Sequence, residues 1–276
     1  MRFRLIPGHN PGPFTGTGTN TYLLPGAAPA LIDAGAGDPR HLDDLAAALD
    51  PGDGRAPSAL ARVLVTHAHS DHAAGTGALV ARWPRAIAAK FPWPEKDARY
   101  SVGFQPLQDD QPVPAGDGVL WTVHTPGHAP DHLCFLEPHS GTLFGGDLVV
   151  NGATVMIPAS SGGNLAHYLA SLRRVLDLQP RRILPAHGSP IEHPAALVRS
   201  YLAHRQIRER QILEQLAAGP LTIAHLVGRI YTDLARDLHG AAAESVLAHL
   251  VKLRDEDAVA EDVEVGGPSR WRLLAR

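Results

Sequence analysis

The segment Thr66-His67-Ala68-His69-Ser70-Asp71-His72 is the strongest indication of the fold in this sequence. It follows an apolar run over residues 61–66 that is typical of a buried strand. Four side chains able to bind a metal therefore stand together where a strand ends. Neutral imidazoles and carboxylates are ligands that zinc and similar cations take, and a set without cysteine leaves room for water, as catalytic centres do. The competing interpretation is a solvated turn that is rich in histidine by chance.

Three further candidates each end an apolar run, which is where sheets covered by helices place functional loops. His128 follows the run 118–124, Asp147 closes a glycine-rich run, and His187 follows the run 182–184. Each of them alone would be an ordinary surface or core residue. Together they complete the predicted ligand set, which is His67, His69, Asp71, His72, His128, Asp147 and His187. Seven ligands exceed what one tetrahedral site uses, so the sequence predicts two divalent metal ions.

The motif His67-x-His69-x-Asp71-His72, followed in order by His128, Asp147 and His187, resembles the motif series of the metallo-β-lactamase superfamily over residues 1–190. The resemblance implies the α+β class, as an αββα sandwich with the metals at one edge of two facing sheets. It also implies how the ligands are divided. One metal takes His67, His69 and His128, the other takes Asp71, His72 and His187, and Asp147 bridges the two. Zinc is the expected metal, and iron or manganese occurs in relatives.

A narrower resemblance, to the lactamase-beta-2-like group, extends over nearly the whole chain. It rests on residues 10–22 and 66–75, on Thr125-Pro126-Gly127-His128 and on a predicted C-terminal winged helix. In animal relatives this resemblance implies endoribonuclease activity on single-stranded RNA, whereas many bacterial relatives have no assigned substrate. Asp147 occupies the bridging place that corresponds to the Cys ligand of the commonest dinuclear β-lactamases, which narrows the expectation to another kind of two-metal hydrolase.

The chain changes character near residue 200, where we expect a domain boundary. Residues 1–199 alternate short apolar runs with Gly- and Pro-rich turns, and we assign them to the catalytic domain. One helix of this domain is predicted over residues 71–83. Residues 200–276 are mostly helical and form the predicted winged helix. Its elements are helices over 195–216, 223–234 (capped by Thr222) and 241–253, then a hairpin over 259–265 and 270–274.

The charge of the C-terminal domain bears on its partner. Residues 200–276 hold 10 Lys+Arg and 11 Asp+Glu, a net charge of −1. Modules that track a phosphate backbone are usually basic, so a packing or homodimerisation module is favoured over a nucleic-acid-binding one. Four arginines nevertheless cluster along one predicted helix and keep the second reading open: Arg199, Arg205, Arg208 and Arg210.

Composition sets the outer bounds on function. The 276 residues are 44% hydrophobic and 19% charged with a formal net charge of −3, which excludes a disordered chain and a strongly basic binder. The single cysteine, Cys134, fits a reducing compartment. The start of the chain lacks the apolar run of a signal peptide, and the longest uncharged stretch, Leu148–Leu172, is interrupted by Pro, Gly and Asn. We therefore expect a soluble cytoplasmic protein with no membrane partner.

Several polar residues near the motifs have no motif position. Asp131, His132, His124, His139 and His193 are expected to support the ligands or lie at the surface rather than bind metal. Metal-bound histidines need carboxylate or carbonyl partners, which makes Asp33 a candidate for that role. Asn20 and Tyr22 either face the site or pack in the core. Cys134 alternates with apolar neighbours and is predicted to be a small buried hydrophobe.

The predicted mechanism is hydrolysis by a hydroxide that bridges the two metals, because metal binding lowers the pKa of water to about 7. Asp71 is the predicted catalytic residue besides its ligand role, orienting the hydroxide or passing its proton. The substrate is either single-stranded RNA or a small ester, thioester or lactone. Basic residues facing the metals would favour RNA, and an apolar pocket built by residues 151–163 would favour an acyl substrate. A non-catalytic binding protein is the third hypothesis, and the complete ligand set argues against it.

Overall fold

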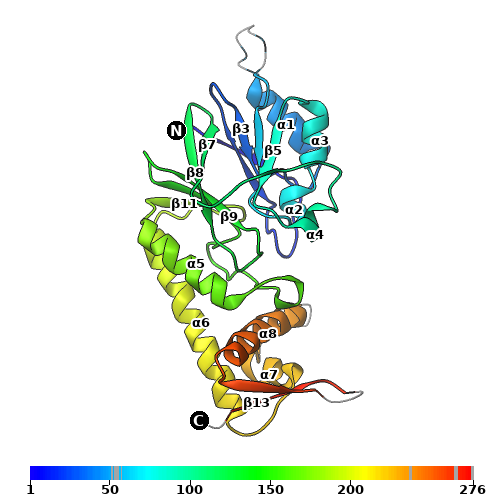
Figure 1. The fold of residues 1–276 in the computed structure, drawn as a ribbon, viewed down its shortest axis with the longest axis vertical. Helices are drawn as coiled ribbons and strands as arrows, with labels where there is room; N and C mark the ends of the chain where they lie inside the picture. Colours follow the sequence, from blue (N-terminus) through cyan, green and yellow to red (C-terminus); the bar gives the residue numbers. More distant parts are fainter. Residues whose placement is uncertain (51, 53–55, 57, 236–237, 264–266, 275–276) are drawn as a thin grey trace. The chain divides into compact units, whose positions relative to one another are not determined.

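The computed structural model describes residues 1–50, 52, 56, 58–235, 238–263 and 267–274. The chain forms two compact units (Figure 1). The first comprises Met1–Thr125, Asp131–Thr154 and Arg174–Leu197, and the second Pro126–Pro130, Val155–Arg173 and Val198–Arg276. The second unit thus takes in two segments that precede the expected boundary near residue 200. That boundary, as a division between two domains, stays a prediction.

The first unit contains two sheets. One has the order β1-β2-β3-β4-β5-β6, with antiparallel pairing from β1 to β3 and parallel pairing from β3 to β6. Its strands are β1 (Arg4–Pro7), β2 (Asn20–Leu24), β3 (Ala30–Ile32), β4 (Arg62–Leu64), β5 (Ile87–Lys90) and β6 (Gln105–Pro106). The other has the order β11-β10-β9-β8-β7 and is antiparallel except for the pair β10 and β11. Its strands are β7 (Pro112–Ala115), β8 (Gly118–His124), β9 (Leu133–Glu137), β10 (Thr142–Gly146) and β11 (Arg182–Pro185).

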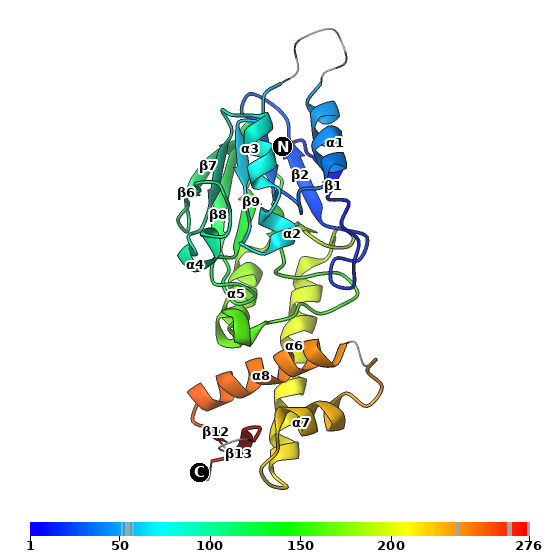
Figure 2. The same cartoon turned by 90° about the vertical axis from the view of Figure 1, so that its right-hand side faces the viewer.

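The core of this unit lies between the two sheets. Buried side chains of the first sheet, such as Ile32 and Leu64, form one cluster with Leu120 and Phe135 of the second. The opposite face of the first sheet packs against α1 (Pro39–Leu49) and α3 (Thr76–Arg82), as Figure 2 shows. Helix α1 begins at Asp38, whose side chain accepts a hydrogen bond from the Arg40 N–H. Facing sheets with helices outside them confirm the predicted α+β sandwich.

The helix predicted over residues 71–83 is divided in the structure. Its parts are α2 (Ser70–Ala73) and α3, with Gly75 between them. A Cβ atom on residue 75 would lie 2.0 Å from the carbonyl oxygen of Ala34, so this close approach requires glycine. The break therefore follows from packing against the loop after β3, which the local helical pattern does not contain. The short helix α4 (Pro94–Asp97) lies further along the chain, after β5.

The second unit is mostly helical. Its elements are η1 (Ala159–Ser161), the first part of α5 (Leu165–Leu178), most of α6 (Pro194–Leu216), α7 (Ile223–Ile230), α8 (His239–Asp255), β12 (Val259–Asp262) and β13 (Arg270–Leu273). Thr222 caps α7 as predicted, accepting from the His225 N–H, although this helix ends at Ile230 rather than at 234. Strands β12 and β13 pair antiparallel as the predicted hairpin does, and residues 264–266 of that hairpin lie outside the described residues. The hydrophobic core of this second unit includes Leu226, Val246 and Trp271.

Within the described part of the chain, no helix has the length and apolar character that crossing a membrane requires.

Candidate metal centre

The predicted ligands of the first unit follow the carboxyl ends of parallel strands. Residues 67–72 come after β4, which runs parallel to β3. Asp147 follows β10 and His187 follows β11, and these two strands are also parallel. Because parallel strands end at the same edge of a sheet, each pair of strands delivers its following residues to one edge.

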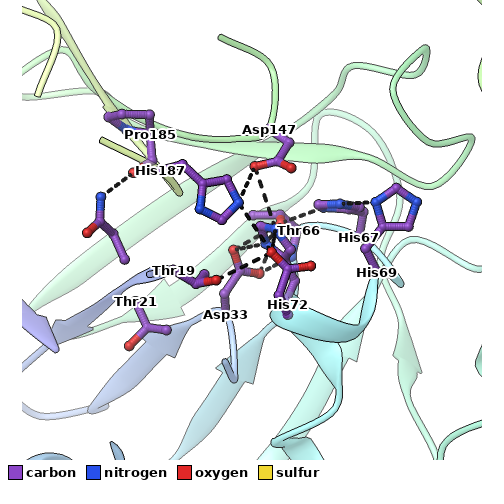
Figure 3. Close-up of polar contacts among 12 residues, drawn as sticks. Thr19, Thr21, Asp33, Thr66, His67, His69, His72, Asp147, Pro185 and His187 are labelled. Carbon is purple, nitrogen blue, oxygen red and sulfur yellow. Dashed lines mark hydrogen bonds and ion pairs between the residues drawn. The ribbon is translucent and has the colours of Figure 1, made fainter. Parts of the chain in front are cut away.

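Six of the predicted ligands belong to this unit, and they lie close together in one cluster at these strand ends (Figure 3). The ligand atoms of His67, His72 and Asp147 lie within 4.8 Å of one another, and so do those of Asp71, His72 and His187. His187 Nε2 lies 3.2 Å from Asp71 Oδ2 and 3.3 Å from Asp147 Oδ1. His67 Nε2 lies 3.0 Å from His69 Nδ1. The donor set is imidazole and carboxylate without thiolate, as zinc, iron and manganese accept.

The His72 ring shows that the site fits a cation. Its Nδ1 donates to Asp33 Oδ2 at 2.8 Å, because a carboxylate can only accept. Nδ1 therefore carries a proton, which makes Nε2 the ring nitrogen that can bind a metal. Among the described residues that buried Nε2 has no hydrogen-bond partner, and it lies 3.3 Å from Asp71 Oδ2 and 3.5 Å from Asp147 Oδ1. The two carboxylates at this nitrogen call for a positive charge, which a proton supplies without metal and a bound cation would supply in its place. The carboxylate behind the imidazole is the usual support of a metal-bound histidine.

Asp33 thus has the supporting role expected from the sequence. Its side chain is buried, with 1% of the residue exposed. Besides His72 it accepts from the backbone N–H of Thr66 at 2.8 Å and from the Thr66 hydroxyl at 3.0 Å. The Asp33 carboxylate therefore fixes Thr66, where the motif begins, and also keeps a proton on Nδ1 of His72, where the motif ends.

His132 supports Asp147 in a similar way. The backbone N–H of Asp147 donates to His132 Nε2 at 3.0 Å, so His132 Nδ1 carries the proton and donates to Thr125 Oγ1 at 2.8 Å. The buried ring is held against the chain at Gly146, where a Cβ atom would come within 2.6 Å of His132 Nε2. Both ring nitrogens of His132 are thus engaged in hydrogen bonds, and its role as a support for Asp147 stays a prediction.

The loop that carries His187 is fixed by two residues of β2. Asn20 Nδ2 donates to the carbonyl oxygens of Pro185 and Gly188, at 3.2 and 2.9 Å. The Tyr22 hydroxyl donates to the Pro185 carbonyl oxygen at 2.7 Å. Burial raises the pKa of Tyr22, which keeps this hydroxyl a donor. Both residues therefore act on the site, and Tyr22 packs in the core as well.

A buried ion pair fixes the backbone between the first two histidines. Asp131 Oδ2 accepts from the Ala68 N–H at 2.8 Å and lies 2.9 Å from Lys90 Nζ, with both side chains fully buried. The Tyr100 hydroxyl donates to the Ala68 carbonyl oxygen at 2.8 Å. Lys90 also binds Asp97 at 2.7 Å. Lys90 and Tyr100 could not be predicted from the motifs, because both are distant from them in sequence and only the fold brings them to Ala68.

The electrostatic field of the cluster favours positive charge. Burial lowers the pKa of His72, but the carboxylates of Asp71, Asp33 and Asp147 outweigh it and hold that pKa well above its usual value. The pKa of His187 is raised through the same competition. Burial raises the pKa of Asp71, and the neighbouring imidazoles more than reverse this, so it falls below its usual range. A divalent cation would take the place that these protons occupy.

The seventh predicted ligand, His128, belongs to the second unit. Its Nδ1 donates to the carbonyl oxygen of Met156 at 2.7 Å, which leaves Nε2 as the nitrogen able to bind a metal. Of the remaining histidines near the motifs, His124 stacks on Phe91 with ring centroids 3.9 Å apart. The backbone N–H of His139 donates to Glu137 in a turn, and His193 is exposed. None of these three is in a potential metal-binding group of the described residues.

The N-terminal and the C-terminal regions of this chain each match a known protein family. Residues 14–187 match the metallo-beta-lactamase superfamily, and residues 222–271 match the beta-lactamase associated winged helix domain. A "Beta-lactamase-like protein 2 homolog" of Drosophila melanogaster is 33% identical over 264 residues, covering 91% of this chain and 87% of the relative. An "Atrochrysone carboxyl ACP thioesterase" of Aspergillus chevalieri is 31% identical, covering 98% of this chain and 86% of the relative. A metallo-beta-lactamase family protein of Thermus thermophilus superposes with a TM-score of 0.80 at 26% identity, covering 99% of this chain and 98% of that one.

The chain is thus a hydrolase with a site able to hold metal. This follows from the sandwich fold, from the His/Asp cluster at its strand ends and from these relatives. The chain belongs to the metallo-β-lactamase superfamily and carries its associated winged helix domain.

Proposed function

We propose that this chain is a dinuclear metal-dependent hydrolase that cleaves small thioesters or esters. The observation that carries the metal assignment is the buried Nε2 of His72, which faces two carboxylates without a hydrogen-bond partner. The substrate class is supported by the thioesterase relative, whose similarity extends over 98% of this chain and so includes both of its parts.

The ligands are divided as the motif implies. His67, His69 and His128 would hold one cation, Asp71, His72 and His187 would hold the other, and Asp147 would serve both. Zinc suits this donor set best, although the set does not exclude iron or manganese. When bound, two such cations supply a water-derived nucleophile at neutral pH and polarise the scissile carbonyl.

The residues of the chain position this chemistry. Asp33 keeps the His72 proton on Nδ1, and His132 fixes the backbone of Asp147. Asp71 stays ionised, so its carboxylate would bind metal and accept a hydrogen bond that orients the attacking water. Cys134 offers no alternative nucleophile, because it is fully buried and burial raises its pKa to about 12.

RNA is the less favoured substrate because residues 200–276 have a net charge of −1, and phosphate backbones attract basic surfaces. The winged helix is proposed to be a packing or dimerisation module. A single buried cysteine suits a cytoplasmic protein.

The test is a direct comparison of substrates. Zinc-loaded protein is assayed with a panel of acyl thioesters and chromogenic esters and with single-stranded RNA oligomers, before and after chelation. We expect thioester or ester turnover that chelation abolishes and zinc restores, and that His72→Ala lacks. RNA cleavage without acyl hydrolysis would overturn the substrate assignment, and turnover by metal-free protein would overturn the metal assignment.

A further inference from the structure

Two charged side chains of the C-terminal helices hold one segment of the second unit, residues 155–161. From α6, Arg205 Nη2 donates to the carbonyl oxygen of Val155 at 2.5 Å. From α8, the Glu244 carboxylate accepts from the Ser160 N–H at 3.1 Å and from the Ser160 hydroxyl at 2.6 Å. The segment between these attachments includes Ile157, which is fully buried. Its backbone is therefore fixed at both ends by residues that lie more than 40 positions later in the chain.

The burial of the Arg205 guanidinium, a positive charge, is energetically unfavourable and needs an explanation. Only 2% of the residue is exposed, and no carboxylate among the described residues forms an ion pair with it. Its guanidinium lies 5.5 Å from the centre of the Tyr168 ring and its Nη1 is 3.5 Å from Ser245 Oγ. Burying a cation without a counter-ion is unfavourable, and a ring face offsets only part of that loss. The Val155 carbonyl is thus the strongest partner of this buried charge.

The peptide that Arg205 holds is adjacent to the one that orients His128. His128 Nδ1 donates to the carbonyl oxygen of Met156, the next residue after Val155. Gly127, just before His128, packs so closely on Tyr168 that a Cβ atom would lie 2.3 Å from the Tyr168 backbone. The same tyrosine ring faces Arg205. The direction of the His128 ring therefore depends on a carbonyl whose neighbour is fixed by α6.

We propose that Arg205 is a positioning residue for His128: by holding the Val155–Met156 backbone, it sets the imidazole so that Nε2 points at the metal. This inference rests on the proposed function, because it takes His128 as a metal ligand. It gives the C-terminal helices an indirect part in metal binding, through the backbone that orients His128. Partners behind a ligating histidine commonly contribute 10–100-fold to metal affinity, and Arg205 acts one peptide further out.

The experiment is a zinc titration of metal-depleted full-length protein in competition with a chromophoric chelator, which yields one dissociation constant for each bound ion. Arg205→Gln should weaken one ion by about tenfold and leave the other within a factor of about two. The matched control is Arg199→Gln, an exposed arginine on the same helix, which should change neither constant. If Arg205→Gln does not fold, Arg205→Lys keeps the charge, loses the planar fork and should show a smaller loss at the same ion.

His128→Ala identifies the ion concerned and separates the two hypotheses. It should abolish binding of the ion that Arg205→Gln weakens, and adding Arg205→Gln to it should not affect the remaining ion. Unchanged constants in Arg205→Gln, or equal weakening of both ions, would overturn the role of Arg205 while leaving the ligand set intact. If His128→Ala itself binds both ions as the parent does, the proposed ligand set is wrong and the inference fails with it.

Discussion

Replacing Asp33 by asparagine changes the tautomer of His72 without changing the volume of the core. An amide has one accepting oxygen and one donating NH₂ group. If its oxygen keeps the 2.8 Å bond from the Thr66 N–H, its NH₂ group faces His72 Nδ1, which now donates to Asp33 at 2.8 Å. The ring must then accept at Nδ1 and carry its proton at Nε2, which blocks metal binding there. Loss of such a partner costs about 10–100-fold in affinity, or about 1.4–2.7 kcal/mol.

We expect the upper end of this range for Asp33→Asn, because the negative charge is lost together with the correct tautomer. The assay is the same chelator competition, with urea unfolding of the metal-free protein to establish that the variant folds. Asp44→Asn is the matched control, since Asp44 Oδ2 lies 2.7 Å from His9 Nε2 in an exposed pair. A folded Asp33→Asn protein that binds both ions with parental affinity would refute the tautomer argument.

Three further outcomes follow from buried groups. His132→Phe removes the acceptor of the Asp147 N–H; urea unfolding should show a loss of about 1–3 kcal/mol and titration a weaker metal site, whereas parental values in both would contradict that support. Burial lowers the pKa of His41 to about 4, so as pH falls below 6.5 the unfolded chain takes up a proton that the folded protein does not. Metal-free parent should therefore lose about 2 kcal/mol more than His41→Gln between pH 7 and pH 5, and equal losses would be inconsistent with a buried neutral His41. Iodoacetamide should label Cys134 only after unfolding, so loss of turnover in step with labelling of the native protein would contradict a metal-dependent mechanism.

Most strands and helices could be predicted from local sequence patterns. The division of one helix and the presence of one edge strand could not, because they depend on tertiary contacts. Apolar runs such as residues 118–124 match their strands because alternation and burial are encoded residue by residue. The helix predicted over 71–83 is divided at Gly75 because the carbonyl of Ala34, far away in sequence, leaves no room for a side chain. The edge strand β7 was not predicted, since its Pro112 and Pro114 argue against a strand unless it is known to lie at an edge.

In the candidate metal site, the ligands could be predicted from the sequence and most of the residues that support them could not. Side chains that bind a metal such as zinc are mostly His, Cys, Asp or Glu, so their spacing in the sequence is informative. Side chains that support the ligands can be of almost any polar type, and only the fold places them. Asp33 is predicted because metal-bound histidines need carboxylate partners, whereas nothing in the sequence points to Lys90 or Tyr100, which act on the backbone of Ala68.

The supports imply that the site is formed before any metal arrives. Each ligand-bearing loop of the first unit is fixed by a hydrogen bond from or to a residue that is not a ligand, namely Asp131, Tyr100, Asp33, His132, Asn20 and Tyr22. The core between the sheets is apolar and contains no ligand. Metal removal should therefore abolish turnover while leaving the far-ultraviolet circular dichroism spectrum unchanged, unlike a structural zinc site, whose protein unfolds without the ion. Because the freed carboxylates are then held close together, the metal-free protein should be less stable, and added zinc should raise its Tm in proportion to the logarithm of excess zinc concentration. A metal-free protein that loses its secondary structure would show that the metals, rather than the surrounding hydrogen bonds, assemble the site.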